Sequence, residues 1–532
     1  MPTIQAFLAA LSLLVCVGLA ADQPSLPALF RGALSNFVLV WLLFAIAERL
    51  GSRWLRWCCL GLIATLLSAT EAHLLINGAY PAVSHAELAI DDSFLAALIG
   101  DGVFGGLLAL NLAWIGALEV VRGRLRPFQA PSRLLTALLP VFSVFLVATA
   151  LFTPGISAHW YARNLLEHQF WWDAKLPESG AAVVDGRTLV PASEGAPLQA
   201  LRVPKHVVLV LIEGLSAEIA ASGATPEIRD LEREGLVVRR FVAHQRQTHR
   251  GLFALLCGAY PNLLTPEAKS HLVALSGLQQ RCLPAELRDA GFRTAFLQSA
   301  DLGYMTKDLF AQAVGFTVVK GQHELASGGA DGPWGLDDRT LFRHALDDLN
   351  AHADQRTFTT LLTSGTHPPY RTPVSSNDKA RAFAFASDSV AWFVEQLRVQ
   401  GLLEDTLVLI TSDESSSIGN GSIGDGIGGV TAGISSSADQ DRTQMPPSNH
   451  GYLLALGAGL QPMEQPGLFG QVDVAISVLD ALGLPPRGFH GASVFRRHAA
   501  DRTLLAANTY KRTIYAIGEQ ALVRCDQMLN CM

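Results

Sequence analysis

The stretch Val207-Val-Leu-Val-Leu-Ile212 runs directly into Glu213, and the stretch Thr406-Leu-Val-Leu-Ile-Thr-Ser412 runs directly into Asp413 and Glu414. Each stretch is a short apolar run, which predicts a strand. Open α/β sheets collect ligands outside the carboxyl ends of their strands. We therefore expect the three acidic side chains to meet at one edge of a sheet, although they lie far apart in the sequence.

Thr248 is the candidate nucleophile. It lies in Gln247-Thr-His-Arg-Gly251, just before an apolar stretch that predicts a helix. At the same sheet edge, the three acidic groups would surround the Thr248 hydroxyl. Three acidic groups around one hydroxyl predict a cation site. A bound cation would lower the pKa of the Thr248 hydroxyl and make it a nucleophile.

From Lys205 onward, strand and helix patterns alternate, as expected for an α/β domain. Further strands are expected at Thr294–Leu297, Phe358–Thr363 and Tyr452–Leu456, and helices at Pro226–Gly235, Leu283–Ala290, Asp338–Ala351 and Lys379–Gln400. The segment Ser415–Ser448 is rich in Gly, Ser and Asp and has no apolar period. It is expected to be a loop beside the site.

The N-terminal part of the chain predicts membrane spans. Mean hydropathy is +0.27, which is high for a soluble protein, and the apolar residues concentrate before the α/β pattern begins. Five expected spans each approach the roughly 20 apolar residues that a bilayer core requires. They are Ile4–Ala20, Phe30–Ala47, Cys58–Ile76, Phe94–Val120 and Leu134–Phe152. The first lacks the basic region of a cleaved signal peptide, so we expect it to be retained.

Loop charges predict the orientation of these spans. Arg49, Arg53 and Arg56 follow the second span, further arginines lie between the fourth and fifth, and the loop after the third is acidic. The positive-inside rule places the arginine loops and the N-terminus in the cytoplasm, so that everything after about Thr153 is extracytoplasmic. The expected organisation is a transmembrane domain over 1–153, an interfacial helix and linker over 154–204, and a catalytic domain over 205–532.

Cysteine usage and net charge narrow the setting. Cys257, Cys282, Cys525 and Cys531 form an even set on the expected oxidising side of the membrane. Proximity in the sequence favours Cys257–Cys282 and Cys525–Cys531, although four cysteines allow three pairings. The net charge of −7 and the lack of a basic stripe argue against nucleic acid as a partner.

From Lys205 to about Phe495 the chain resembles the sulfatase/alkaline-phosphatase superfamily, and within it the lipoteichoic acid synthase-like phosphoglycerol transferases. The resemblance rests on ordered motifs. They are Val-Leu-Ile-Glu-Gly ending at Gly214, Gln-Thr-His-Arg-Gly around Thr248, Cys-Gly-Ala-Tyr-Pro ending at Pro261, Thr366-His-Pro-Pro-Tyr370, Thr411-Ser-Asp-Glu414 and Gln471-Val-Asp-Val. The resemblance implies an α/β alkaline-phosphatase/sulfatase-like domain, with a central mixed sheet flanked by helices, after an N-terminal five-helix transmembrane domain.

The resemblance also implies a ligand set. Glu213, Thr248 and Asp413 would be metal ligands, and Thr248 the nucleophile. Glu414 stands where the family usually has a histidine, which makes the site all oxygen. Hard oxygen ligands favour Mn²⁺ or Mg²⁺ over Zn²⁺. His450, in Ser448-Asn-His-Gly451, is a competing ligand.

Three more residues are candidates for contact with the substrate, and the first two lie in stretches that resemble substrate-contacting stretches of the family. His367 would contact the phosphate and protonate the leaving alkoxide, or it is a loop histidine satisfied by backbone. Lys307 would meet the phosphate in place of the usual arginine, as a point charge, or it is a solvated helix residue. Arg250 would support the turn at Thr248 or contact phosphate.

The implied enzyme is a metal-dependent phosphotransferase of the bacterial cytoplasmic (inner) membrane, with several spans and a catalytic domain facing the periplasm or outside. It would move glycerol phosphate from phosphatidylglycerol to a periplasmic or surface glycan or glycolipid through a phosphothreonine. One alternative is a phosphoethanolamine transferase acting on lipid A or another glycolipid, a group that keeps the histidine and binds zinc. Another is a non-catalytic glycolipid-binding envelope protein.

Overall fold

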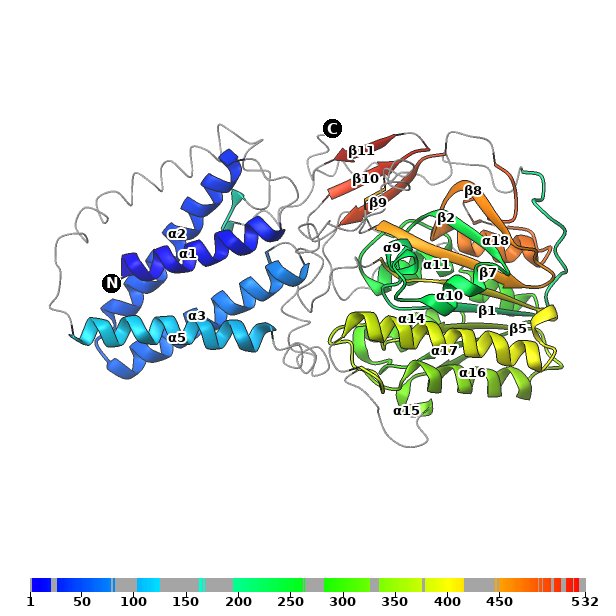
Figure 1. Cartoon of the computed structure of the whole chain (residues 1–532), viewed down its shortest axis with the longest axis horizontal. Helices are drawn as coiled ribbons and strands as arrows, with labels where there is room; N and C mark the ends of the chain where they lie inside the picture. Colours follow the sequence, from blue (N-terminus) through cyan, green and yellow to red (C-terminus); the bar gives the residue numbers. More distant parts are fainter. Residues whose placement is uncertain are drawn as a thin grey trace. The chain divides into compact units, whose positions relative to one another are not determined.

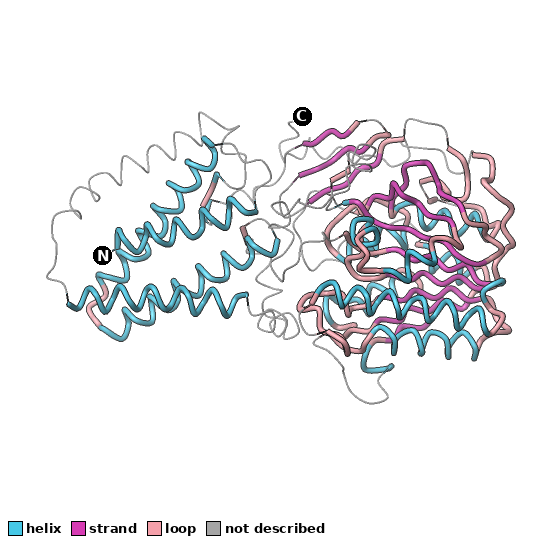
Figure 2. The backbone as a smooth tube through the Cα atoms, viewed as in Figure 1, coloured by secondary structure: helices cyan, strands magenta, loops and turns pink. Residues whose placement is uncertain are grey.

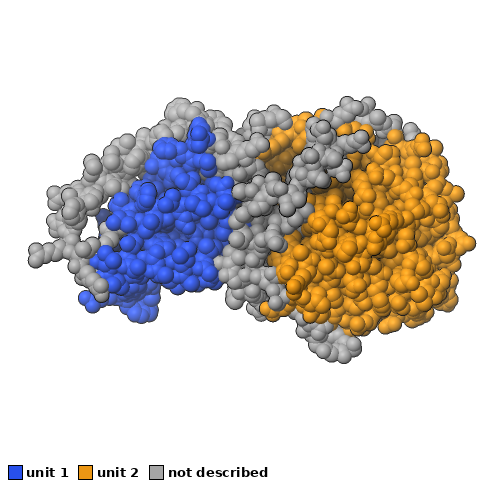
Figure 3. All heavy atoms as spheres, viewed as in Figure 1, with its two compact units in different colours: residues 1–90, 98–176, 421–433 blue, residues 91–97, 177–420, 434–532 orange. Residues whose placement is uncertain are grey.

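The structure is a computed structural model of the chain. It describes residues 2–20, 26–77, 80–81, 103–124, 162–164, 166–167, 195–261, 263, 282–325, 334–375, 378–415, 445–446, 449–486, 488–489, 491–498, 502–508, 513–519 and 521–525. These residues fall into two compact units, which Figure 3 colours separately.

The first unit contains four long helices: α1 (Pro2–Ala20), α2 (Leu26–Arg49), α3 (Arg53–Asn77) and α5 (Val103–Arg124). Three of them are long and apolar enough to cross a membrane, over Leu26–Arg49, Arg53–Leu75 and Phe104–Val121, and α1 contains a shorter apolar stretch. The first four expected spans fall on these helices. Residues 94–102 and the expected fifth span lie outside the described residues, as does most of the expected interfacial segment.

Polar side chains inside the first unit are paired between helices. Glu71 of α3 accepts hydrogen bonds from Ser12 of α1 at 2.6 Å and from Asn111 of α5 at 2.8 Å. Arg56 and Glu119 form an ion pair at 2.8 Å. Such pairing is expected because a lone charge in hydrocarbon is costly.

The second unit is built on an eight-stranded mixed sheet flanked by helices (Figures 1 and 2). Its strand order is β4-β3-β5-β1-β6-β7-β2-β8. The strands are β1 (His206–Leu211), β2 (Leu236–Val242), β3 (Arg293–Gln298), β4 (Val318–Lys320), β5 (Thr357–Leu362), β6 (Thr406–Thr411), β7 (His450–Gly457) and β8 (Met463–Gly470). Only β7 runs antiparallel to its neighbours. The expected central mixed sheet is confirmed.

Helices cover both faces of this sheet, so the side chains of β1 and β6 are buried on both sides. That explains their nearly unbroken apolar sequences. One face packs against α11 (Thr248–Cys257), α13 (Leu283–Asp289), α14 (Lys307–Ala313) and α18 (Val472–Ala481). The other packs against α9 (Ala217–Ala221), α10 (Pro226–Leu231), α16 (Asp338–Ala351) and α17 (Lys379–Val399).

Two cross-links complete the second unit. The disulfide Cys257–Cys282 joins the end of α11 to the start of α13, which confirms that predicted pairing. Cys525 is also disulfide-bonded, and Cys531 lies outside the described residues.

A separate three-stranded sheet, β9 (Leu504–Asn508), β10 (Thr513–Ile517) and β11 (Leu522–Cys525), was not expected from the sequence. The strands β2, β4 and β8 of the eight-stranded sheet were not expected from the sequence either.

Candidate active site

The carboxyl ends of β1 and β6 bring the acidic residues together. The two strands are parallel neighbours with Leu211 opposite Thr411, so Glu213 and Asp413 leave the sheet side by side. The turn after β1 is tight, because Gly214 has a φ of +66° that favours glycine. Its N–H donates to Asp413 Oδ1 over 3.4 Å. Two carboxylates expected from the sequence to meet at a sheet edge therefore do so.

The carboxylates are buried and repel one another. Glu213 is 7% exposed and Asp413 is fully buried. Burial raises the pKa of Glu213 well above its usual value, the charges of Asp413 and Glu414 raise it further, and the ammonium of Lys307 partly opposes them. With Glu213 ionised, no described group donates a hydrogen bond to Asp413 Oδ2, which is buried. The cluster thus holds negative charge that its protein surroundings only partly compensate.

Thr248 begins helix α11 beside this cluster. Its Oγ1 donates to Glu213 Oε2 over 3.5 Å. The helix can approach because residue 251 is glycine: a Cβ there would lie 1.7 Å from the carbonyl oxygen of Asp413. A helix N-terminus also favours negative charge, such as that of an alkoxide or a phosphate. The expected nucleophile, its helix and two acidic residues therefore share one site.

Lys307 is buried rather than solvated. It is the first residue of α14, 6% exposed, and its Nζ lies 5.2 Å from the centre of the Tyr304 ring. Burial lowers the pKa of Lys307, while the charges of Glu213 and Asp413 oppose that lowering. The two preceding residues, Met305 and Thr306, have φ values of +59° and +53°. Such left-handed backbone in side-chain-bearing residues is strained and clusters at functional sites.

His367 lies on the loop that follows β5. This loop is tied to Glu213, whose N–H donates to Thr363 Oγ1 over 3.1 Å and whose carbonyl accepts from Thr366 Oγ1 over 2.7 Å. His367 Nδ1 donates to the carbonyl of Pro368 over 2.8 Å, so Nε2 is the basic nitrogen. Burial lowers the pKa of His367; the charge of Lys307 lowers it further, and that of Asp413 raises it.

A second loop contact supports His367. Its ring and the Trp334 ring form an edge-to-face contact with the centroids 4.4 Å apart. Asp338, which the site prediction did not include, accepts the N–H groups of Gly365 over 3.1 Å and Ser364 over 3.4 Å. Burial raises the pKa of Asp338 to about 6. This carboxyl is therefore a loop support rather than a further member of the acidic cluster.

Three predicted site residues remain, namely Arg250, Glu414 and His450. Arg250 is buried on α11 at 5% exposure. Glu414 lies close enough to raise the pKa of Glu213. His450 instead donates from Nε2 to the carbonyl of Arg239 over 2.8 Å, and no described interaction connects its ring to the acidic cluster. The structure thus gathers Glu213, Thr248, Asp413, Glu414, Lys307 and His367, and leaves His450 outside.

The donor set has the chemistry of a hard-cation site. Its donors are carboxylate and hydroxyl oxygens, its charge is incompletely compensated, and Asp413 Oδ2 is an unpartnered buried acceptor. Among the residues that the structure describes, however, no three acidic, histidine or cysteine side chains already close into a coordination shell. The residues therefore fit a hard cation by the chemistry of their donor atoms.

Comparison with known proteins gives related sequences. Phosphoglycerol transferase I of Xanthomonas campestris pv. campestris (strain B100) is 26% identical over 412 residues, which cover 72% of this chain and 55% of that protein. Phosphoglycerol transferase I of Escherichia coli O157:H7 is 27% identical over 215 residues, covering 36% of this chain and 27% of that protein. The chain thus spans about half the length of the Xanthomonas relatives it matches.

Solved structures show the same fold. A protein in the alkaline phosphatase superfamily from Vibrio parahaemolyticus matches with a TM-score of 0.52 at 18% identity, covering 65% of this chain and 82% of that one. The lipoteichoic acid synthase LtaP from Listeria monocytogenes matches with a TM-score of 0.52 at 14% identity, covering 66% and 91%. The sequence model of the Sulfatase family matches residues 205–484, more than half of the chain. This chain therefore belongs to the sulfatase family, and its second unit has the alkaline-phosphatase-like fold.

Proposed function

We propose that this chain is a membrane-anchored phosphoglycerol transferase. It moves glycerol phosphate from phosphatidylglycerol to a periplasmic or surface glycan, through a phosphothreonine at Thr248. The observation that carries the proposal is the half-buried Thr248 hydroxyl bonded to Glu213, with Asp413, Lys307 and His367 around it. The similarity to phosphoglycerol transferase I supports the transferred group.

A divalent cation completes the proposed site. Glu213, Thr248, Asp413 and Glu414 would hold it, and their oxygens favour Mn²⁺ or Mg²⁺ over Zn²⁺. When bound, the cation lowers the pKa of the Thr248 hydroxyl and compensates the carboxylates. Lys307 already supplies part of that compensation, as its effect on the pKa of Glu213 indicates.

In the first step, Thr248 Oγ1 attacks the phosphorus of the lipid and the bond to the diacylglycerol oxygen breaks. The hydroxyl proton passes to Glu213, its hydrogen-bond partner. The leaving alkoxide takes a proton from Nε2 of His367. The anionic phosphodiester beside His367 favours the protonated imidazole that this transfer needs, because it opposes the effect of burial.

In the second step, a hydroxyl of the acceptor attacks the phosphothreonine. His367, now neutral, takes the proton of that hydroxyl, and Thr248 leaves and recovers its proton from Glu213. Both steps spread negative charge over the phosphoryl oxygens, next to which Lys307 lies as a fixed positive charge. A chain with apolar spanning helices keeps such a site at the bilayer surface, where its lipid donor resides.

The test uses the full-length protein in vesicles that contain labelled phosphatidylglycerol, with release of diacylglycerol as the measurement. Thr248→Ala should abolish release. Thr340→Ala is a matched control, because Thr340 also lies in the first turn of a helix and its hydroxyl donates to the capping Asp337. Release by Thr248→Ala at the wild-type rate would refute the proposal.

Two outcomes of the same assay favour the alternatives. Release from phosphatidylethanolamine but not phosphatidylglycerol, with zinc bound, favours a phosphoethanolamine transferase. Binding of a glycolipid without any release favours a non-catalytic envelope protein. Glu414 in place of histidine argues against the first, and the intact cluster of Thr248, Lys307 and His367 argues against the second.

A further inference from the structure

The side-chain amide of Gln471 forms hydrogen bonds with main-chain groups next to the candidate active site. Gln471 is completely buried and immediately precedes α18. Its Nε2 donates to the carbonyl of Ser412 over 3.0 Å and to that of Asp413 over 2.7 Å. Its Oε1 accepts the N–H of His244 over 3.0 Å. Because the amide donates on one side and accepts on the other, its orientation is fixed.

The carbonyl of Asp413 is bounded on a second side by the helix of the nucleophile. Gly251 of α11 lies so close that an added Cβ would meet this oxygen at 1.7 Å. On the side chain of Asp413, Oδ1 accepts from Gly214 and Ser412 over 3.4 and 3.3 Å, while Oδ2 is the unpartnered oxygen. Gln471 and α11 therefore hold the main chain of Asp413 in place, and this main chain sets the direction in which Oδ2 points.

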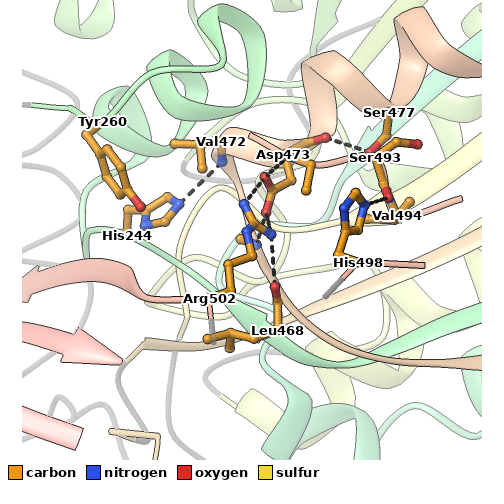
Figure 4. Close-up of polar contacts among 12 residues, drawn as sticks. His244, Tyr260, Leu468, Val472, Asp473, Ser477, Ser493, Val494, His498 and Arg502 are labelled. Atoms are coloured by element: carbon orange, nitrogen blue, oxygen red, sulfur yellow. Dashed lines mark hydrogen bonds and ion pairs between the residues drawn. The ribbon is translucent and has the colours of Figure 1, made fainter. Parts of the chain in front are cut away.

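The segment carrying Gln471 is itself pinned, as Figure 4 shows for its neighbours. His244 Nε2 accepts the N–H of Val472 over 3.3 Å, and its Nδ1 donates to the carbonyl of Leu505 in β9 over 2.5 Å. Burial lowers the pKa of His244 to about 4, so the ring is neutral and can accept at one nitrogen while donating at the other.

Two residues after Gln471, Asp473 forms a buried ion pair with Arg502, with oxygen–nitrogen distances of 2.5 and 2.8 Å (Figure 4). Asp473 also accepts the N–H groups of Gly470 over 2.8 Å and Ala492 over 2.7 Å. The residues around Gln471 are thus fixed from both directions, and the amide has a rigid base.

We propose that Gln471 is a positioning residue for the cation site: it fixes the Asp413 main chain and thereby aims Oδ2 at the cation. This inference rests on the proposed function, in which Asp413 is a ligand. Groups that orient a ligand from behind typically change metal affinity by about 10–100-fold when they are removed. A glutamine that served only to stabilise the fold would not change cation affinity.

The chain offers a matched control in Gln465 of β8. Gln465 is 2% exposed, and its Nε2 also donates to two carbonyls, those of Val494 over 2.6 Å and Arg496 over 3.1 Å. Its Oε1 accepts the N–H of Gly467 over 3.3 Å. None of these groups belongs to the site. The two glutamines therefore perform the same bonding at different places.

The experiment measures Mn²⁺ binding to the full-length protein in detergent by calorimetry, together with its thermal unfolding. Gln471→Met and Gln465→Met remove the amide at constant length and should lower the unfolding temperature similarly. Only Gln471→Met should weaken Mn²⁺ binding, on the order of 10–100-fold. Gln471→Glu, whose protonated carboxyl restores one donor, should fall between it and the wild type and serves if Gln471→Met does not fold.

The outcomes separate the two proposals. If Asp413→Asn loses Mn²⁺ binding while Gln471→Met and Gln471→Glu bind as tightly as the wild type, the positioning role is refuted and the cation site stands. If Gln465→Met weakens binding as much as Gln471→Met, the effect belongs to general stability and the positioning role is again refuted. If the wild type binds no divalent cation, or Asp413→Asn binds normally, the cation site of the proposed function falls with it.

Discussion

Replacing Gly251 with alanine should damage catalysis more than folding. The added Cβ would lie 1.7 Å from the carbonyl oxygen of Asp413, half the 3.4 Å at which ordinary van der Waals contact begins. The atoms it meets are backbone, so either α11 or the turn after β6 must move. Because Thr248 is three residues away on the same helix, the shift moves the nucleophile relative to the acidic cluster.

The expected magnitudes follow from this displacement. Overpacking costs about 1–3 kcal/mol of unfolding free energy, and replacing a helical glycine with alanine returns up to about 1 kcal/mol. Folding should therefore survive. A misplacement of about 1 Å at a reacting group can reduce the rate on the order of 100-fold. Gly251→Ala should thus lose most of its turnover while its unfolding temperature changes by a few degrees.

The assay compares diacylglycerol release and thermal unfolding for Gly251→Ala and Gly61→Ala. Gly61 is also helical, in α3, and an alanine there would meet nothing within 4 Å. The control should retain activity and stability. A Gly251→Ala protein with wild-type turnover would refute the inference that this contact sets the position of Thr248.

Lys307→Met should reduce turnover on the order of 100-fold, because it removes a fixed charge that stabilises the phosphoryl oxygens. It should also lower the unfolding temperature, since it leaves the buried carboxylates of Glu213 and Asp413 less compensated. The control is Lys205, which precedes β1 and whose ammonium donates to the carbonyl of Ala353. Lys205→Met should keep its turnover, and equal losses of turnover in the two variants would contradict the role of Lys307. His244 has a folded pKa of about 4 against 6.5 for its ordinary value, so its contribution is fully present above pH 6.5 and is lost as pH falls toward 4. The neutral His244 contributes about 3 kcal/mol to the free energy of unfolding in this way. His244→Asn should therefore show a smaller fall in unfolding temperature between pH 6.5 and 4 than the wild type. Parallel curves of unfolding temperature against pH for the two proteins would contradict this prediction.

The elements that the sequence predicts well are those with a strong local pattern. The runs ending at Glu213 and Asp413 are almost wholly apolar because helices cover both faces of β1 and β6, and the order of strands then places both residues at one edge. The membrane helices are equally visible, because length and hydropathy define them. In β2, by contrast, Arg239 and Arg240 interrupt the apolar pattern, and this strand was not expected.

The contacts that the sequence could not predict are those made by packing alone. A lysine at the start of a predicted helix is ordinarily solvated, so the sequence alone does not predict the burial of Lys307 behind the strained turn at Met305 and Thr306. The motif containing Gln471 was evident, but its bonds to Asp413 span 58 residues and require the folded sheet. His450 lies next to a predicted loop, and only the pairing of β7 with β2 reveals that its ring faces the Arg239 carbonyl.

Mass spectrometry of the full-length protein after incubation with phosphatidylglycerol, without any acceptor, tests the central claim most directly. The account predicts a glycerol phosphate adduct on the peptide that carries Thr248, absent from Thr248→Ala. An active protein that carries no adduct, or carries it on another residue, would contradict the account.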